Sequence, residues 1–233
     1  MSCISFKNVT KSFNGTPVLK SASFTVEKGE ICGFIGRNGS GKTVIFRLMT
    51  GLLRPDEGEV TVEGRSYERE GRFCESLGVM IETPGFIPHY SGLKNLKILN
   101  SMSAEKVSVK EICALMERLG LNPKNRRPVR TYSLGMRQKL GIIQAVMNKP
   151  RILVLDEPVN SLDSEAAADV RRLFAELNRQ GTTIVLASHI AEDIEALCTR
   201  IFRIENGSVT ELTPVKSDNS GKETQNEICS DRP

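Results

Sequence analysis

The sequence predicts an α/β fold in which a lobe of helices is inserted into a core of alternating strands and helices. Two observations support this prediction. A glycine-rich loop connects an apolar strand at 31–35 to a helix at 41–49, and strand–helix alternation returns after residue 150. Between these parts, from about 84 to 150, the periodicity is mainly helical. The 233 residues are enough for one compact domain and few for two.

The N-terminal part reads as a series of short strands, because short apolar runs are separated by turn-forming residues. Gly15, Pro17 and Gly29 provide breaks. The expected strands lie at 4–6, 18–19, 24–26, 31–35, 59–63 and 78–81. The last of these runs ends at Glu82.

Helical and strand patterns follow each other in the second half. Helices are expected at 107–119 and at 133–147, with Ser133 at the N-cap of the second. Continuous apolar runs predict buried strands at 152–155 and 182–187.

A further helix is expected between these two strands. Ser164 is its expected N-cap and Gly181 ends it. An apolar stripe at helical spacing turns one face of it to the core. The stripe consists of Val170, Leu173, Phe174 and Leu177. Beyond it, Asn206-Gly207 in the middle of 200–211 is a hairpin signature.

The end of the chain differs in composition from the rest. From Pro214 onward it is polar and has few apolar residues to bury, which predicts a disordered tail over 214–233. Residues 1–213 then form the folded domain, with 84–150 as its helical lobe.

The overall composition is that of an ordinary globular protein, with 39% hydrophobic and 26% charged residues. A net charge of +4, spread along the chain, is too small an excess to indicate a nucleic-acid partner. The one dense basic cluster consists of Lys124, Arg126, Arg127 and Arg130. Its ordinary interpretation is a solvated face, and the alternative is a contact with phosphates or lipid headgroups.

Cysteine usage and hydropathy bear on the compartment. The six cysteines are scattered without the close spacing of metal ligands, which favours reduced thiols in a cytosolic protein. The first residues lack the basic start and apolar stretch of a signal peptide. No segment approaches the roughly 20 apolar residues that cross a bilayer. We therefore expect any membrane-spanning part to be a separate chain.

The glycine-rich loop matches the phosphate-binding pattern G-x-x-x-x-G-K-[ST] in full. Its residues are Gly36, Arg37, Asn38, Gly39, Ser40, Gly41, Lys42 and Thr43. The glycines let backbone N–H groups turn toward the β- and γ-phosphates of a nucleotide. Lys42 and the following helix N-terminus add positive potential, and the Thr43 hydroxyl is placed to ligate Mg²⁺. The alternative is a chance match in a glycine-rich turn, which leaves the flanking strand and helix as coincidences.

Two adjacent carboxylates follow the strand at 152–155. Asp156 can hold Mg²⁺ through its water shell, and Glu157 can polarise the water that attacks a γ-phosphate. Solvation of a strand end explains one exposed acid, but two in a row before Pro158 favour a nucleotide-hydrolysing site.

With these motifs in this order, roughly residues 3–212 resemble the nucleotide-binding domain of ABC transporters. The family's Leu-Ser-Gly-Gly-Gln signature is matched by Ser133-Leu134-Gly135-Met136-Arg137-Gln138, and its D-loop by Asn160-Ser161-Leu162-Asp163. The switch histidine is matched by Ser188-His189. Phe13 stands where the family stacks an aromatic ring on adenine. Each is weak alone, since a strand-end histidine is usually structural and a phenylalanine is commonly core. Their order and spacing together are specific.

The sequence also departs from the family pattern. Tyr132 replaces the first leucine of the signature, and Leu134 replaces one of its glycines. Glu82 stands where the family has glutamine, and the D-loop reads Asn-Ser-Leu-Asp instead of ending in Gly-Leu-Asp. Ile-Glu-Thr-Pro-Gly-Phe and Ser-Leu-Gly-Met-Arg-Gln-Lys-Leu-Gly are similar to the branch that exports bacitracin and lantibiotic peptides, and to drug exporters with separate membrane subunits.

The resemblance implies a P-loop NTPase core with an N-terminal antiparallel β subdomain and an inserted α-helical subdomain. It implies ATP and Mg²⁺ as cofactors, with Thr43, Asp156 and Glu82 as metal-site residues. It places Glu157, His189 and Glu82 in catalysis. A carboxylate at Glu82 binds Mg²⁺ more strongly than an amide, yet is repelled by Glu157. We expect Glu82 to reach the metal only in a closed dimer, and the alternative is that it points to solvent.

The resemblance further implies a head-to-tail dimer, in which each ATP lies between one chain's phosphate loop and Ser133 and Gly135 of the other. The partner is an identical copy or a paired ATP-binding subunit, and no nucleic acid is involved. Closure would act on a separate transmembrane permease through the Pro- and Gly-rich stretch 82–96, unless that stretch is an ordinary loop. The implied role is export of a peptide antibiotic, drug or similar substrate, from the cytoplasmic face of the membrane.

Two other functions share part of this sequence pattern. A soluble ABC ATPase that acts as an assembly factor, for example in iron–sulfur cluster building, has the same motifs, and only Glu82 and the exporter-like signature count against it. An ATPase acting on nucleic acids requires long coiled-coil insertions or two cassettes in one chain, and the sequence has neither.

Overall fold

Two sheets organise the part of the chain that the computed structural model describes, residues 2–66, 76–82 and 85–212. The first sheet is antiparallel and has the order β2-β1-β4-β5. Its strands are β1 (Ser2–Phe13), β2 (Thr16–Glu27), β4 (Glu57–Val62) and β5 (Arg65–Ser66). This sheet is the antiparallel β subdomain that the resemblance implies.

The second sheet is central to the domain and has the order β10-β9-β3-β8-β7-β6. It is parallel except for its edge strand β10, which is antiparallel to β9. Its strands are β3 (Ile31–Ile35), β6 (Leu77–Met80), β7 (Ile152–Asp156), β8 (Thr183–Ala187), β9 (Arg200–Glu205) and β10 (Ser208–Leu212). Because the inner strands are parallel, the segments that follow β3, β6, β7 and β8 all leave from one edge of the sheet.

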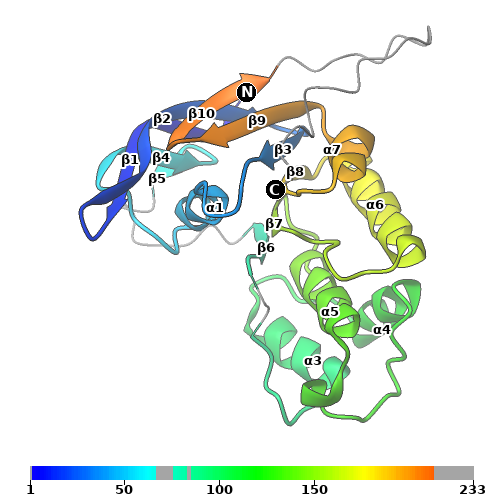
Figure 1. Ribbon diagram of the computed structural model, residues 1–233. Helices are drawn as coiled ribbons and strands as arrows, with labels where there is room; N and C mark the ends of the chain where they lie inside the picture. The colour runs from blue at the N-terminus through cyan, green and yellow to red at the C-terminus, as the bar shows by residue number, and fades with distance from the viewer. Residues whose placement is uncertain (1, 67–75, 83–84, 213–233) are drawn as a thin grey trace, which may run out of the picture.

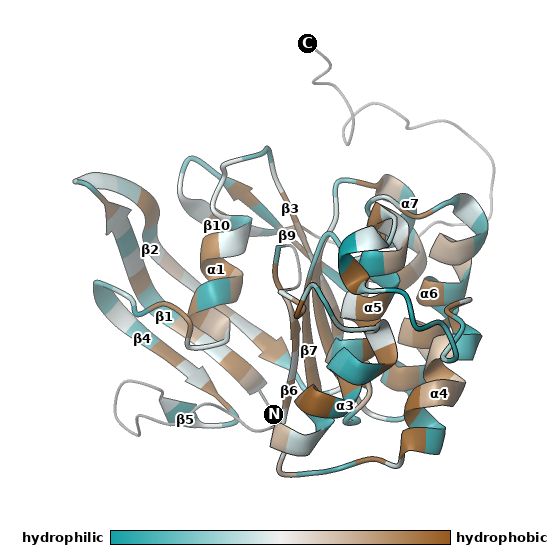
Figure 2. Cartoon of the chain, turned by 90° about the horizontal axis from the view of Figure 1, so that it is seen from below, coloured by the Kyte–Doolittle hydropathy of each residue, from teal (hydrophilic) through white to brown (hydrophobic). Residues whose placement is uncertain are grey.

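The helices are divided between the core and a separate lobe. Helix α1 (Lys42–Met49) lies between the two sheets (Figure 2). Helices α6 (Ser164–Arg179) and α7 (Ala191–Leu197) pack on the other side of the central sheet. The lobe lies between β6 and β7 in sequence and stands apart from the antiparallel sheet (Figure 1). It consists of α3 (Gly92–Met102), α4 (Val109–Arg118), the short 3₁₀ helix Val129–Thr131 and α5 (Leu134–Val146).

Aromatic packing holds α1 and the two sheets together. Five buried phenylalanines from β1, β2, β3, α1 and β9 form one connected cluster. Its ring centroids lie between 4.4 and 5.7 Å apart. Stacked and edge-on pairs at such distances add to the free energy of burial. The phosphate loop, between β3 and α1, therefore starts and ends on rigid elements.

Several expectations about single elements are confirmed. Ser133 caps α5, since its hydroxyl accepts a hydrogen bond from the Met136 N–H at 3.2 Å. Asn206 and Gly207 form the turn between β9 and β10, with φ of 51° and 85°. Two residues with positive φ give the turn type that matches strand twist in a hairpin.

Three expectations need correction. The short strands predicted before residue 27 are parts of two strands of 12 residues each, joined at Asn14-Gly15. Bulges interrupt the register of this pair and break the apolar alternation that marks a long strand. The N-cap of α6 is Asp163, not Ser164, because its carboxylate accepts the Ala166 N–H at 2.8 Å. The stretch 82–96 is not all loop, since α3 begins at Gly92 with Ser91 as its N-cap.

The predicted tail 214–233 lies outside the described residues. In the ranges that the structure does describe, no helix is both long and apolar enough to cross a bilayer.

Candidate active site

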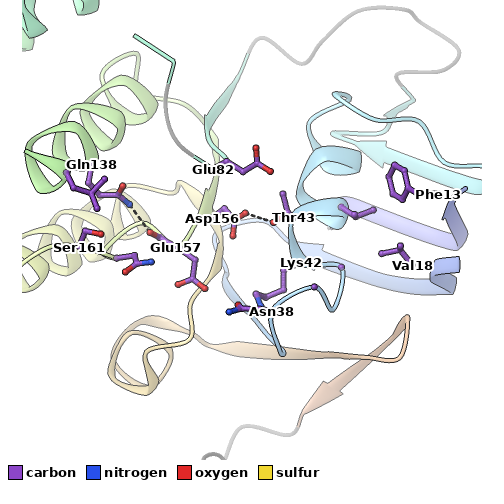
Figure 3. Close-up of a pocket in the computed structure, with 15 residues that line it drawn as sticks. Phe13, Val18, Asn38, Lys42, Thr43, Glu82, Gln138, Asp156, Glu157 and Ser161 are labelled. Carbon is purple, nitrogen blue, oxygen red and sulfur yellow. Dashed lines mark hydrogen bonds between the residues drawn. The ribbon is translucent and has the colours of Figure 1, made fainter. Parts of the chain in front are cut away.

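A hollow of about 580 Å³ opens at the edge of the central sheet where β3, β6 and β7 end. The phosphate loop forms one wall, and the segment after β7 forms the other (Figure 3). The rest of the lining comes from other elements: Phe13 of β1, Val18 of β2, Glu82 just after β6, and Leu134 and Gln138 of α5. Motifs that are more than 110 residues apart in sequence therefore meet in one place.

The phosphate loop is tight and contains an unsatisfied polar atom. A Cβ at Gly36 would lie 2.6 Å from the Ile204 carbonyl oxygen and 2.7 Å from Ser40 Oγ, so only glycine fits there. Gly41, the N-cap of α1, has a φ of 110°, which disfavours any other residue. The buried hydroxyl of Ser40 has no hydrogen-bond partner among the described residues. Buried polar atoms are normally satisfied, so this loop is suited to a polar ligand.

Lys42 is a nearly buried cation at the start of α1. It is 8% exposed, and its ammonium donates hydrogen bonds to the carbonyl oxygens of Gly36 at 2.6 Å and Arg37 at 3.1 Å. These carbonyls bring no formal charge to balance the ammonium. A ligand with negative charge in the loop would supply it.

Thr43 and Asp156 form an oxygen-rich pair at the floor of the hollow. The Thr43 hydroxyl donates to Asp156 Oδ2 at 2.8 Å. Burial raises the pKa of Asp156, an effect that the hydrogen bond from Thr43 and the charge of Lys42 oppose. A hydroxyl and a buried carboxylate side by side fit a hard divalent cation such as Mg²⁺, which favours the charged carboxylate.

Glu157 is held at both its backbone and its side chain. Its φ of 50° is in the left-handed region, and its N–H donates to the Ala187 carbonyl at 3.0 Å. Its carboxylate Oε2 lies 2.7 Å from Nδ1 of His189. His189 comes from the end of β8 and contacts Glu157 without itself lining the hollow. The structure thus brings together two residues to which the family resemblance gives catalytic roles.

Glu82 reaches the same hollow but has a partner of its own. Its Oε1 forms an ion pair at 2.7 Å with Nη2 of Arg47 on α1. Both side chains are substantially exposed, at 57% and 42%. The charge of Glu82 is near enough to Asp156 to contribute to its raised pKa. The structure therefore does not leave Glu82 pointing freely into solvent.

Phe13 and the signature residues lie at the borders of the hollow. Phe13 is 42% exposed, which is unusual for a large aromatic side chain, and the Lys11 ammonium lies over its ring, 5.7 Å from the centroid. Ser133 and Gly135, at the N-terminus of α5, do not line the hollow that contains Lys42 of the same chain. Gly135 instead packs against Ser161 of the D-loop-like stretch.

Two contacts at this site had no signal in the sequence. The side-chain amide of Gln138 donates to the carbonyl oxygens of Glu157 at 2.8 Å and Pro158 at 3.0 Å. Arg47 pairs with Glu82 across 35 residues. Both contacts depend on how the helices are placed against β6 and β7, which no local pattern reports.

The basic cluster lies on the helical lobe, away from this site. Lys124 and Arg126 share a second hollow, of about 780 Å³, with Lys94 and Lys97 of α3. Lys94 also lies over the Tyr90 ring, 3.6 Å from its centroid.

Comparison with known sequences gives matches that span these motifs. A family model described as ABC transporter matches residues 19–160. The chain is 40% identical over 200 residues to YybJ of Bacillus subtilis, an uncharacterized ABC transporter ATP-binding protein, covering 86% of this chain and 91% of that one. It is 37% identical to the bacitracin transport ATP-binding protein BcrA of Enterococcus faecalis, covering 89% and 68%. It is 34% identical to the lantibiotic transport ATP-binding protein SrtF of Streptococcus pyogenes, covering 88% of each.

Solved structures share the fold. An ATP-binding subunit of an ABC transporter superposes with a TM-score of 0.83 at 24% identity, covering 91% of this chain and 90% of that one. A dimeric ATP-binding cassette in a post-hydrolysis state, bound to ADP and phosphate, superposes with a TM-score of 0.82 at 23% identity, covering 91% and 99%. At these identities the likeness concerns the fold, whereas the sequence matches include the phosphate loop and Asp156.

Proposed function

The chain belongs to the ABC transporter family of ATPases, and from this premise we propose that it powers an exporter as one half of a head-to-tail dimer. The observation that carries the proposal is the convergence of the phosphate loop, Asp156 and Glu157 on one hollow at the edge of the central sheet (Figure 3). Two relatives are named as bacitracin and lantibiotic transport proteins, which supports a peptide antibiotic, a drug or a similar molecule as the substrate.

The nucleotide would be held along the phosphate loop. Backbone N–H groups of this loop and the ammonium of Lys42 would contact its phosphates, and the α1 N-terminus would add its dipole. The exposed ring of Phe13 lies at the border of the same hollow, where it can stack on the adenine.

Glu157 is the proposed base for hydrolysis. Water attacks the γ-phosphorus, the bond to the bridging oxygen of ADP breaks, and the proton of the water passes to the Glu157 carboxylate. His189, 2.7 Å from that carboxylate, fixes its direction. Thr43 and Asp156 are the residues that would hold Mg²⁺, which neutralises charge that develops on the phosphate oxygens.

The proposed dimer gives the start of the signature helix a ligand. Ser133 and Gly135 do not line the hollow of their own chain, although Leu134 between them does, and they lie at an exposed helix N-terminus, a place suited to an anion. In a two-fold arrangement they would contact the γ-phosphate bound by the partner, an identical copy or a paired subunit. ATP then joins the two chains and hydrolysis releases them.

Dimer closure would act on a separate transmembrane permease subunit. Glu82 lines the hollow and α3 of the helical lobe begins at Gly92, so we place the permease contact in the stretch 82–96, from which closure of the dimer would reach the membrane subunit. This puts the domain at the cytoplasmic face of the membrane. Residues 1–213 carry the ATP chemistry, and 214–233 are an appendage to it.

Replacing Glu157 with glutamine tests the proposal, because it keeps the shape and removes the base. We expect ATP to bind normally, the turnover rate to fall by about 10²–10⁴-fold, and a dimer to accumulate with ATP on size-exclusion chromatography. Glu165→Gln, an exposed substitution in the first turn of α6, is the matched control. A Glu157→Gln variant with the wild-type rate contradicts the assignment.

A further inference from the structure

Gln138 connects the signature helix to the peptide that carries the proposed base. It lies on α5, and its Nε2 donates to the carbonyl oxygen of Glu157 at 2.8 Å (Figure 3) and to that of Pro158 at 3.0 Å. Both acceptors are carbonyls, so only the NH₂ end of the amide can face them. The contact is partly buried and joins two elements 19 residues apart.

The backbone at Glu157 needs such support. A φ of 50° is uncommon for a residue with a side chain and costs roughly 1–2 kcal/mol. Such conformations persist where the surroundings hold them. The peptide between Glu157 and Pro158 has no N–H, because proline lacks one, so its carbonyl is the only group that can be tied down. The Gln138 amide fixes this carbonyl by donating a hydrogen bond to its oxygen.

We propose that Gln138 is a positioning residue for hydrolysis, which fixes the Glu157 peptide and makes the direction of its carboxylate depend on the place of α5. The inference rests on the proposed role of Glu157. A displaced base is costly, since an error of 1 Å in a reacting group can lower a rate by about a hundredfold.

The position of Gln138 along α5 gives this contact a second consequence. Gln138 lies five residues after Ser133, the N-cap proposed to meet the partner's nucleotide. At 1.5 Å per residue this is roughly 7.5 Å along a rigid helix. A shift of α5 when the partner's ATP binds is therefore transmitted to Glu157, so that each site responds to the other.

Gln138→Glu tests the inference because it keeps the side-chain shape but turns the donor into an acceptor that faces two carbonyls. We expect kcat to fall at least about tenfold, with the KM for ATP and the ATP-dependent dimer within about threefold of wild type. Gln138→Ala, which removes the donor without adding charge, should lose kcat in the same way. Gln144→Glu on the same helix is the matched control, and its kcat should be unchanged.

A double variant separates positioning from a structural role. When Glu157 is already glutamine, adding Gln138→Glu should change the remaining single-turnover rate by less than about threefold, because both act through one group. The inference is overturned if Gln138→Glu lowers the single-turnover rate in the Glu157→Gln chain as much as in the wild type. It is also overturned if both Gln138 variants keep the wild-type kcat. Either result leaves the proposed function intact. Wild-type turnover in Glu157→Gln alone overturns the proposed base itself.

Discussion

Lys42 is a nearly buried cation whose hydrogen bonds, among the described residues, go to carbonyl oxygens of its own loop. Lys42→Met separates its role in binding from its role in folding. Methionine keeps the length and apolar stem of the side chain. Without nucleotide, the loss of two hydrogen bonds is offset by removal of a buried charge. We expect the free energy of unfolding to change by no more than about 1 kcal/mol, because the desolvation cost of the ammonium, on the order of several kcal/mol, opposes the hydrogen bonds that it makes.

With nucleotide the effect is large. A hydrogen bond to a charged group contributes up to about 3 kcal/mol, which corresponds to a roughly hundredfold increase in Kd when it is lost. At a nucleotide concentration of 100 times the wild-type Kd, the wild-type chain gains about 2.7 kcal/mol and the variant about 0.4 kcal/mol. For a domain of this size, these values correspond to Tm increases of about 5–11 °C and about 1–2 °C.

Thermal unfolding with and without a non-hydrolysable ATP analogue and Mg²⁺ measures both quantities. Lys110→Met, an exposed substitution on α4, is the control and should show the wild-type increase. The reasoning is refuted if Lys42→Met keeps the full increase in Tm. It is also refuted if the variant without nucleotide is several kcal/mol less stable, since Lys42 would then be a structural residue.

Three further predictions concern other parts of the chain. Glu82→Gln should bind ATP and retain some hydrolysis but require more Mg²⁺ for half-maximal rate. Glu82→Ala should lose both the hydrolysis rate and transport. If Glu82→Ala keeps the Mg²⁺ dependence and transport of the wild type, Glu82 is a surface residue without a role at the metal. Truncation after Thr213 should leave ATP binding and Tm unchanged, and loss of either would mean that the tail docks on the domain. Phe174→Ala, at a fully buried site on α6, should lower the free energy of unfolding by about 3–5 kcal/mol in chemical denaturation, and a loss below about 1 kcal/mol would contradict the packing described.

Local signals predicted the parts of the site that one segment builds alone. The phosphate loop is a contiguous motif with a strand before it and a helix after it, and Asp156 and Glu157 follow directly from a buried strand. The cap at Ser133 and the turn at Asn206 are also local, because a side chain or a positive φ within a few residues determines them.

The sequence was less informative where distant segments decide the structure. Bulges between β1 and β2 hide a long hairpin, and the helix from Gly92 lies in a stretch whose prolines and glycines suggest a loop. The contacts Arg47–Glu82 and Gln138–Glu157 join segments that meet only once the helical lobe is placed against the central sheet. No periodicity or motif in either segment encodes its partner.

The central claim is that each ATP is shared between two chains, and a mixing experiment tests it most directly. Lys42→Met lacks a working phosphate loop. Gly135→Asp adds negative charge at the α5 N-terminus, beside the place proposed for the partner's γ-phosphate, with its Cβ 3.0 Å from the Ser161 carbonyl oxygen. Each variant alone should be inactive. In an equal mixture every heterodimer has one intact site, so with random pairing we predict about a quarter of the wild-type ATPase rate. If heterodimers form and no activity returns, Ser133 and Gly135 do not act on the partner's nucleotide, and the shared-site account is wrong.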